Sequence, residues 1–269
     1  MNITVLANND LASNVALNYL YQAVGQEHTL RVFLSARVGK TSAQTTVAKG
    51  LEALRFVEQT LVNDILFPAL GVRENVPEGN LATFAELAQQ GVSVQKIGSI
   101  NDEQGLATIK AGAPDLIISI RFGLILKDPV LNIARYGVIN LHSGMLPDYR
   151  GVMACFRAMQ NNEPNIASTL HYIRDASIDS GDIITVYSMP LNYQASYLAN
   201  LLALYKGGVD SIVAAIRQIH VNGRAESHGQ TGGGNYYSFP TEADLQAFSD
   251  KGLLLFSPED VVAFSKWYF

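Results

Sequence analysis

An amide, an imidazole and a carboxylate occur in an order that could support acyl transfer. Asn140 and His142 stand two residues apart, and Asp179 follows before a Ser-Gly pair. An amide can stabilise an oxyanion, an imidazole can take a proton from an attacking amine, and a carboxylate can relay protons. The spacing does not identify the acyl group, and each residue also has a purely structural interpretation. An Asn-x-His pair is often a structural hydrogen-bonded pair, and an Asp before Ser-Gly is usually a turn former.

A strand and a turn are needed to bring these side chains together. Residues two apart on a strand point to the same face, so Asn140 and His142 should project together. We expect them at the carboxyl end of a central strand, where open α/β sheets bind their ligands. Ser180 and Gly181 suit a tight turn that returns Asp179 to this strand end.

Short apolar strands and amphipathic helices alternate along the chain, which predicts an α/β fold with a Rossmann-like, open, mostly parallel sheet. Asp10 should cap a helix whose apolar face includes Leu11, Val15, Tyr19 and Leu20. The expected strands are 3–7, 30–34, 92–97, 116–120, 138–142, 168–173 and 183–188. The expected helices are 43–63, 81–90, 101–111, 152–161 and 195–220, the last with a break near Gly207-Gly208.

The composition changes near residue 222. Residues 1–222 are predicted to form the catalytic domain. Residues 223–269 are predicted to form a glycine-rich linker, flexible over 229–235, and a short aromatic C-terminal appendage. The appendage is too short to bury a core of its own, so it should pack on the main domain.

Composition and charge exclude several classes of protein. The net charge of −5 argues against nucleic acid as a partner. The single cysteine, Cys155, forms no internal disulfide or thiolate cluster, and the five histidines lack zinc-ligand spacing, so no metal is expected. The first residues do not resemble a signal peptide, and the apolar runs are too short for a membrane-spanning helix. We expect a soluble, cytoplasmic protein; the sequence leaves open whether it is a homodimer.

Three motif fragments fail on inspection. Gly39-Lys40-Thr41 resembles the end of a P-loop, but Leu34 stands where that motif needs glycine. The first strand–helix turn is Asn8-Asn9-Asp10 rather than a glycine-rich dinucleotide motif. No G-x-S-x-G nucleophile elbow occurs.

Two linked motifs resemble the folate-dependent formyltransferases. That family's signature is N-x-H, then a loop with L-P and often Y-R-G, then D-x-G-x-I. The resemblance extends over about residues 1–190 and is sharpest over 114–186. The matching residues are Asn140-Leu141-His142, Leu146-Pro147, Tyr149-Arg150-Gly151 and Asp179-Ser180-Gly181-Asp182-Ile183.

The resemblance implies a role for each matching residue. Asn140 would hold the formyl oxygen of 10-formyltetrahydrofolate. His142 would assist proton removal and oxyanion stabilisation, and Asp179 would shuttle a proton to the departing folate nitrogen. The pteridine would lie against residues near the catalytic strand, with backbone groups of 175–179 at its edge, although these residues could also be ordinary core. The implied folate-binding residues are Arg121, Phe122, Leu124, Ile125, Leu126 and Asp175.

The sequence departs from the family pattern at two places. Family members usually have S-L-L-P where this chain has Ser143-Gly144-Met145-Leu146-Pro147, and the glycine predicts a more mobile loop. In the T-x-H strand, Ala167-Ser168 replaces the usual preceding glycine, and His171 is expected to be structural.

The acceptor amine is inferred from the layout of the chain. The short aromatic tail and acidic charge argue against tRNA and favour a dTDP- or UDP-linked amino sugar. Met145, Tyr149 and Arg150 would then line the pocket mouth, and Tyr236, Tyr237 or Trp267 would stack on the ligand or simply seal the fold. The alternatives are another small amine such as N-hydroxyornithine, a formyltetrahydrofolate hydrolase, or a non-catalytic folate-binding relative.

Overall fold

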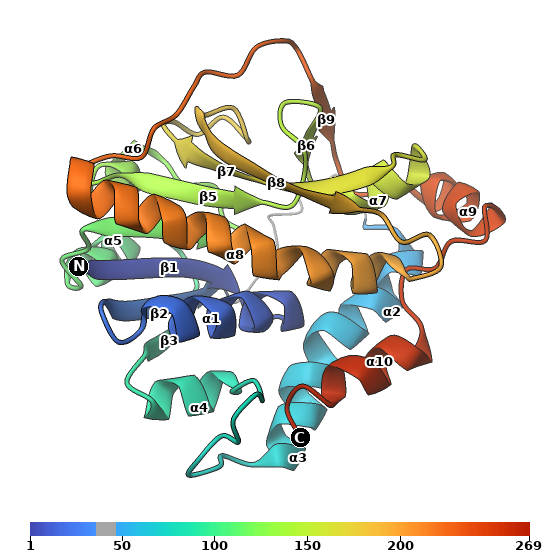
Figure 1. Cartoon of the computed structure of the whole chain (residues 1–269), viewed down its shortest axis with the longest axis horizontal. Helices are drawn as coiled ribbons and strands as arrows, with labels where there is room; N and C mark the ends of the chain where they lie inside the picture. Colours follow the sequence, from blue (N-terminus) through green and yellow to red (C-terminus); the bar gives the residue numbers. More distant parts are fainter. Residues whose placement is uncertain (36–46) are drawn as a thin grey trace.

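A seven-stranded mixed sheet forms the centre of the computed structural model, which describes residues 1–35 and 47–269 (Figure 1). The strand order is β3-β2-β1-β4-β5-β7-β8, in which the neighbours from β3 to β5 are parallel and β7 and β8 are antiparallel. This confirms the predicted Rossmann-like α/β fold. The strands are β1 (Asn2–Asn8), β2 (Thr29–Ser35), β3 (Ser93–Ile97), β4 (Leu116–Ile120), β5 (Val138–His142), β7 (Asn165–Ile173) and β8 (Ile183–Pro190). A separate two-stranded sheet pairs β6 (Tyr149–Gly151) with β9 (Asn235–Tyr237).

Helices cover both faces of the large sheet. The helical elements are α1 (Leu11–Val24), η1 (Lys49–Leu51), α2 (Glu52–Arg55), the π-helix η2 (Phe56–Leu66), α3 (Phe67–Leu70), α4 (Phe84–Gln89), α5 (Glu103–Lys110), α6 (Asp128–Leu131), α7 (Ala154–Gln160), α8 (Tyr197–Asn222), α9 (Glu242–Asp250) and α10 (Pro258–Ser265). Helices α1 and α8 share the main core with one sheet face, and α5 and α6 share a second cluster with the other.

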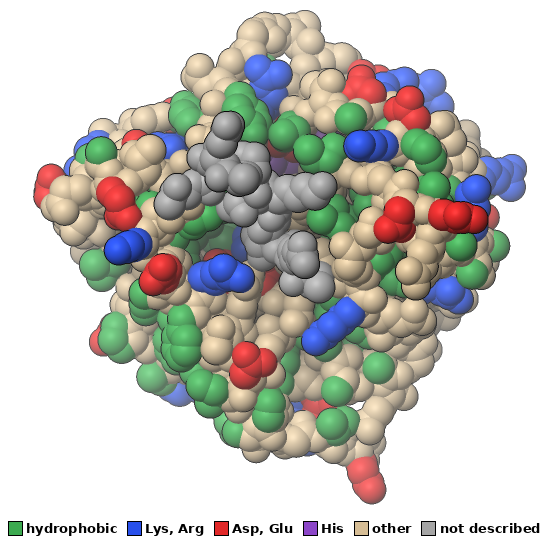
Figure 2. Space-filling view, turned by 180° about the vertical axis from the view of Figure 1, so that it is seen from behind, with side chains coloured by type: hydrophobic (Ala, Val, Ile, Leu, Met, Phe, Trp, Pro, Cys, Tyr) green, Lys and Arg blue, Asp and Glu red, His purple; other side chains and the backbone are tan. Residues whose placement is uncertain are grey.

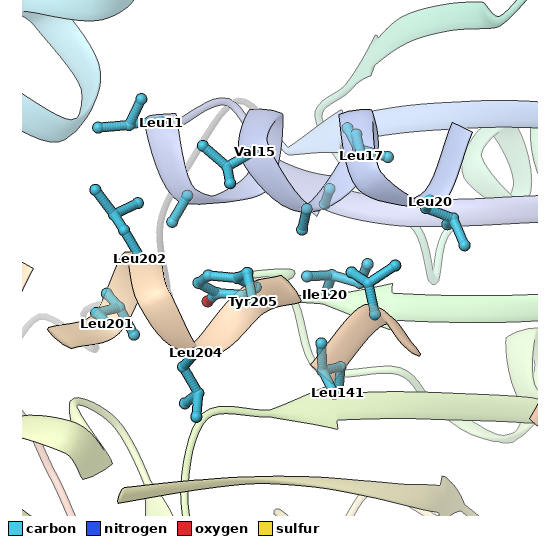
Figure 3. Close-up of a cluster of buried hydrophobic side chains, with 14 of the residues drawn as sticks. Leu11, Val15, Leu17, Leu20, Ile120, Leu141, Leu201, Leu202, Leu204 and Tyr205 are labelled. Carbon is cyan, nitrogen blue, oxygen red and sulfur yellow. The ribbon is translucent and has the colours of Figure 1, made fainter. Parts of the chain in front are cut away.

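The first helix begins as the sequence predicts. The Asp10 side chain accepts a hydrogen bond from the Ser13 N–H at 2.8 Å and caps α1. Apolar side chains of α1 then meet those of α8, β4 and β5 (Figure 3). The predicted helix 43–63 lies partly outside the described residues, and Gly39-Lys40-Thr41 lies wholly outside them. The described helical run continues from Lys49 to Leu70.

Helix α8 runs unbroken through Gly207 and Gly208, so the predicted break is wrong. Both glycines serve close packing. A Cβ on Gly207 would collide with the Tyr187 ring, and one on Gly208 would lie 3.1 Å from Leu141. The expectation of no membrane-length helix also needs correction, because α8 is long and apolar enough by composition. However, 61% of its most apolar window is buried, as expected of a core helix.

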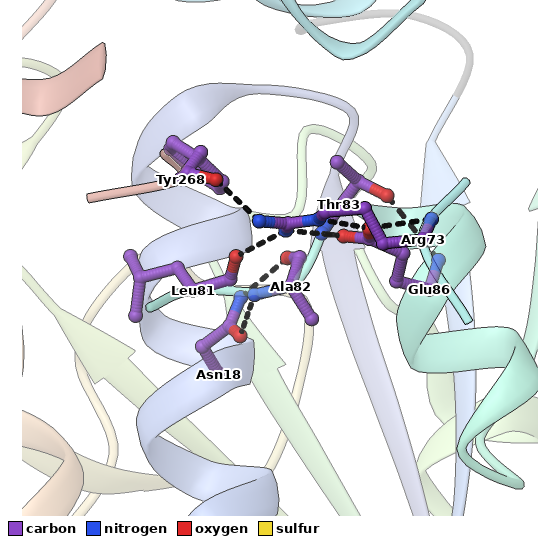
Figure 4. Close-up of polar contacts among 7 residues, drawn as sticks. All are labelled: Asn18, Arg73, Leu81, Ala82, Thr83, Glu86 and Tyr268. Carbon is purple, nitrogen blue, oxygen red and sulfur yellow. Dashed lines mark hydrogen bonds and ion pairs between the residues drawn. The ribbon is translucent and has the colours of Figure 1, made fainter. Parts of the chain in front are cut away.

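The C-terminal segment packs on the main domain. Tyr268 is fully buried, and its hydroxyl donates to the Asn14 side chain at 2.6 Å. Arg73 donates to the Tyr268 carbonyl at 2.5 Å and pairs with Glu86, which also closes the cap of α4 (Figure 4). Phe248 and Phe264 from α9 and α10 are buried in the main core.

Candidate active site

Strand β5 directs Asn140 and His142 away from the main core. Ile139 and Leu141 belong to the cluster beneath α8, whereas Val138 belongs to the cluster beneath α5 and α6. Because side chains alternate along a strand, Asn140 and His142 project from the same face as Val138. The predicted pairing of these two residues on one face therefore agrees with the observed strand.

The loop between β7 and β8 brings Asp179 to the same place. Asp179 Oδ2 lies 3.4 Å from His142 Nδ1 and accepts a hydrogen bond from the Gly151 N–H at 2.9 Å. Asp179 has a left-handed backbone, with φ 51°. Gly181 follows it, and any Cβ there would collide with the Tyr172 carbonyl oxygen. The amide, imidazole and carboxylate thus converge through a strained turn.

Both ring nitrogens of His142 have partners. Nε2 lies 2.6 Å from the Tyr149 carbonyl oxygen, and Nδ1 faces Asp179. A carbonyl can only accept, so Nε2 carries a hydrogen and donates it. The ring is therefore held between the two loops that follow β5 and β7, and Nε2 cannot take a proton while this hydrogen bond persists.

His171 is a fourth member of the site that the sequence interpretation left as structural. It lies directly opposite Asn140 in the β5–β7 register. His171 Nε2 is 3.1 Å from Asn140 Nδ2 and 3.5 Å from Asp179 Oδ1. Its Nδ1 donates to the Tyr172 carbonyl, which leaves Nε2 to accept from Asn140 when the ring is neutral. The T-x-H pattern in the sequence could have drawn attention to His171. The pairing of β5 with β7, which places His171 opposite Asn140, could not be predicted from the sequence.

Asp179 is held in its ionised form. Burial alone would raise its pKa, but the neighbouring His142 and His171 rings and the Gly151 N–H together lower the pKa to about 2. One hydrogen of the Asn140 amide is used by His171, and the amide carries a second donor. The site can thus offer a hydrogen-bond donor beside a fixed negative charge.

Gly144 does not serve the mobility that the sequence predicted. A Cβ on Gly144 would lie 2.5 Å from His142 Nε2 and 2.6 Å from Ala154 Cβ. The loop after β5 also bonds to β7, because the Thr169 hydroxyl donates to the Gly144 carbonyl at 2.7 Å. The glycine therefore allows a close approach of the loop to the His142 imidazole.

The residues predicted for the pocket mouth are mostly engaged in the fold. Tyr149 is buried, stacks on Tyr237 and donates its hydroxyl to Glu163 at 2.6 Å. Arg150 donates to the Gly233 carbonyl at 2.5 Å. Both side chains thus hold neighbouring segments, and their place at a pocket mouth stays a prediction. Met145 is half-buried against the main core.

The predicted pteridine residues divide into three groups. Arg121 directs its guanidinium to Asp10 at 3.0 Å and to Glu58 at 3.1 Å, so its side chain is committed to ion pairs. Leu126 is buried core, as the alternative interpretation held, and Phe122 and Leu124 pack on the same cluster half-exposed. Ile125 and Asp175 are exposed.

The aromatic residues of the C-terminal tail differ in position and exposure. Tyr237 packs between Tyr149 and Arg157, and so seals the fold. Trp267 lies beside Leu81, whose N–H donates to the Trp267 carbonyl, and it lines a surface pocket together with residues of α1. Tyr236 is 56% exposed, and its ring would lie 3.0 Å from a Cβ on Gly151, beside the active site.

The molecular surface carries charges of both signs. On the face opposite the view of Figure 1, Lys, Arg, Asp and Glu side chains are interspersed with hydrophobic ones (Figure 2). Among the described residues on this face, neither sign of charge forms a broad patch of the kind that binds a phosphate backbone.

Known proteins match this chain in sequence and in fold. A sequence profile of the family described as Formyl transferase matches residues 82–198. Methionyl-tRNA formyltransferases from Aromatoleum aromaticum and Macrococcus caseolyticus are 30% and 35% identical over 48% and 38% of this chain. These alignments span only 40% and 32% of the two relatives.

Solved structures of similar fold cover more of the chain at lower identity. A sugar N-formyltransferase from a Shewanella species is 16% identical, with a TM-score of 0.58 over 91% of this chain and 78% of that one. Glycinamide ribonucleotide transformylase 1 from Symbiobacterium toebii is 15% identical, with a TM-score of 0.55 over 85% and 93%. An N-formyltransferase from Helicobacter canadensis, in complex with folinic acid and dTDP-3-aminofucose, is 19% identical, with a TM-score of 0.53 over 91% and 72%.

Proposed function

We propose that this chain, whose residues 82–198 match the formyl transferase family, moves a formyl group from 10-formyltetrahydrofolate to the amine of a small molecule. The observation that carries this proposal is the convergence of Asn140, His142 and Asp179 on one face of β5. An amide donor, an imidazole and an ionised carboxylate at one point are what acyl transfer to an amine requires.

The surroundings of Asn140 fit a reduced pterin. Phe122 and Leu124 are half-exposed on the face from which Asn140 projects, and Ile125 is 54% exposed. Residues 121–127 form no helix or strand, so their backbone N–H and C=O groups can meet the polar edge of a planar ring. The folate would supply the formyl group as a substrate.

Each member of the site then has a chemical task. Asn140 donates its second amide hydrogen to the formyl oxygen, which gains negative charge as the amine attacks. His142, held by the Tyr149 carbonyl, keeps its ring and any positive charge beside the reacting carbon. Asp179 takes the proton that the amine loses and passes it toward the departing nitrogen. His171 orients the Asn140 amide.

We propose a nucleotide-linked amino sugar, carried by dTDP or UDP, as the acceptor. The net charge of −5 disfavours tRNA. Tyr236 supports a nucleotide or sugar, because it presents an exposed aromatic ring beside Gly151, whose N–H bonds to Asp179. The buried, free Cys155 suits a reducing compartment, and we propose the cytoplasm.

Calorimetry with a panel of dTDP- and UDP-linked amino sugars, with 10-formyltetrahydrofolate analogues present, tests the acceptor. Binding of one sugar should weaken about 5- to 150-fold in Tyr236→Ala, because stacking on an aromatic ring contributes about 1–3 kcal/mol. Tyr236→Phe retains the ring and should bind like the wild type. Folate binding without any response to the panel would redirect the search to N-hydroxyornithine and similar amines.

A further inference from the structure

The segment His228–Tyr237, which we call the strap, crosses both loops that build the catalytic centre. It follows α8 and arches over the sheet to β9 (Figure 1). Near its start, His228 and Ile183 exchange two backbone hydrogen bonds of 2.9 Å. At its end, β9 pairs with β6 in the loop after His142. The strap lies beyond residues 82–198, the part that matches the family profile.

Gln230 ties the strap to the turn that carries Asp179. Its Nε2 donates to the Asp179 carbonyl at 2.9 Å and to the Gly181 carbonyl at 2.8 Å, so both amide hydrogens are used. Asp179 has the left-handed backbone described above. A residue in that conformation persists when its surroundings fix it, and the Gln230 carboxamide supplies two such restraints.

The other end of the strap holds the loop that carries Tyr149. Arg150 donates to the Gly233 carbonyl at 2.5 Å, and the Asn235 N–H donates to the Asp148 carbonyl at 3.2 Å. The Val152 N–H donates to the Tyr237 carbonyl at 2.9 Å. The predicted flexible linker over 229–235 is therefore bonded at several points to the loop between β5 and α7.

The two partners of His142 thus both lie on backbone that the strap holds. Nε2 donates to the Tyr149 carbonyl in β6, and Nδ1 faces the Asp179 carboxylate. Gly151, also in β6, donates its N–H to the same carboxylate oxygen. A shift of either loop would change the position of the imidazole, the carboxylate or both.

We propose that the strap positions the catalytic centre and that Gln230 is the positioning residue for Asp179. This inference rests on the proposed formyl transfer and goes beyond it. Gln230 acts only through the carbonyls of the Asp179 turn, because its donated bonds end there. Loss of its two donors should leave the substrate-binding surfaces intact and lower the rate of the chemical step.

Three variants of the full chain separate positioning from folding. Gln230→Met keeps the side-chain length and removes both donors, whereas Gln230→Lys restores a donor with more than one hydrogen. Gln218→Met is the matched control. It removes the hydrogen bond from the Glu226 N–H to Gln218 Oε1, at 3.1 Å, which holds the segment just before the strap and does not involve the Asp179 turn.

The assay is steady-state formyl transfer to the dTDP- or UDP-linked amino sugar that binds in the calorimetric panel. Gln230→Met should lower kcat about 10- to 100-fold, because small displacements of reacting groups have effects of this size. Its KM for 10-formyltetrahydrofolate should stay within about twofold of the wild type, and Gln230→Lys should recover most of kcat. A wild-type kcat in Gln230→Met, or an equal loss in Gln218→Met, would overturn the proposal.

Amide hydrogen exchange tests the strap independently of the reaction. The Gly151 N–H bonds to Asp179, so it should exchange at least about tenfold faster in Gln230→Met and remain protected in Gln218→Met. If the wild type transfers no formyl group, the proposed function fails and this exchange still decides the strap. Unchanged protection of Gly151 in Gln230→Met would overturn the positioning role whatever the reaction.

Discussion

At the scale of single residues, the proposed active site depends on a close approach of the loop backbone at Gly144 to the His142 side chain. Gly144 lies so close to His142 that an added Cβ would stand 2.5 Å from Nε2. From the sequence, the glycine in this loop, where family members usually have S-L-L-P, predicts greater mobility. The structure gives another, since the small residue makes room for the imidazole.

Gly144→Ala should therefore impair catalysis and stability together. We expect kcat to fall about a hundredfold as the His142 ring is displaced, and stability to fall by about 1–3 kcal/mol from overpacking. Steady-state kinetics and urea denaturation measure the two effects. Gly98→Ala is the control, because a Cβ there has open space and should change neither quantity. A fully active Gly144→Ala would show that His142 tolerates the shift.

The Asp179 carboxylate should also appear in the pH dependence of stability. Its pKa in the folded chain is about 2, below the value of about 3.9 in an unfolded chain. The resulting stabilisation, about 2 kcal/mol, is fully present above the unfolded pKa and is lost as the pH falls through the folded one. Relative to Asp179→Asn, the wild type should lose this amount between about pH 4 and pH 2 in urea titrations. Parallel curves for the two proteins would contradict the assigned ionisation.

At the scale of elements, a buried ion cluster joins the segment after β4, the start of α1 and the helix η2. Arg121 follows β4, Asp10 caps α1 and Glu58 lies on η2. Burial raises the pKa of Glu58 in spite of the neighbouring guanidinium. The cluster occupies the point where the strand order reverses between β1 and β4. It therefore fixes the carboxyl end of β4, which pairs with β5.

Arg121→Met should destabilise the chain by about 3–5 kcal/mol, because it leaves two buried carboxylates without a counter-charge. Chemical denaturation at pH 8 gives the value. Lys206→Met breaks an exposed pair with Asp210 and should cost about 0.5 kcal/mol or less. Equal effects of the two substitutions would mean that the Arg121 cluster contributes no more than a surface pair.

The sequence was sufficient to predict the bounds of β4 and β5, the strands next to the candidate site. The observed β4 and β5 coincide with the expected 116–120 and 138–142, because buried strands have a strong local apolar signal. The two ion-pair partners of Arg121 could not be predicted from the sequence, because long-range packing brings Asp10 and Glu58 to it. The same holds for His171, whose place beside Asn140 is set by the β5–β7 register.

At the scale of the whole molecule, the C-terminal segment completes the domain. Tyr268 is fully buried beside α1, whereas the adjacent Phe269 is 69% exposed. The short length of the tail predicted that it would pack on the main domain. It could not show which ring is buried, or that the glycine-rich stretch before the tail is bonded to the active-site loops.

Tyr268→Ala should cost about 3–5 kcal/mol of unfolding free energy, as is typical for a large buried aromatic side chain. Phe269→Ala is a matched neighbour and should change stability by about 0.5 kcal/mol or less. Urea denaturation of both variants provides the comparison. Similar small losses would show that the C-terminal segment only rests on the domain.

Formyl transfer to an amine is tested most directly by the rate at which tetrahydrofolate forms from 10-formyltetrahydrofolate. The formylated amine is followed by mass spectrometry. The wild type should form both products in equal amounts, and Asn140→Ala should be about a hundred- to a thousandfold slower while still binding folate. Formylated product at the wild-type rate in Asn140→Ala, or formate in place of formylated amine in the wild type, would contradict the assignment.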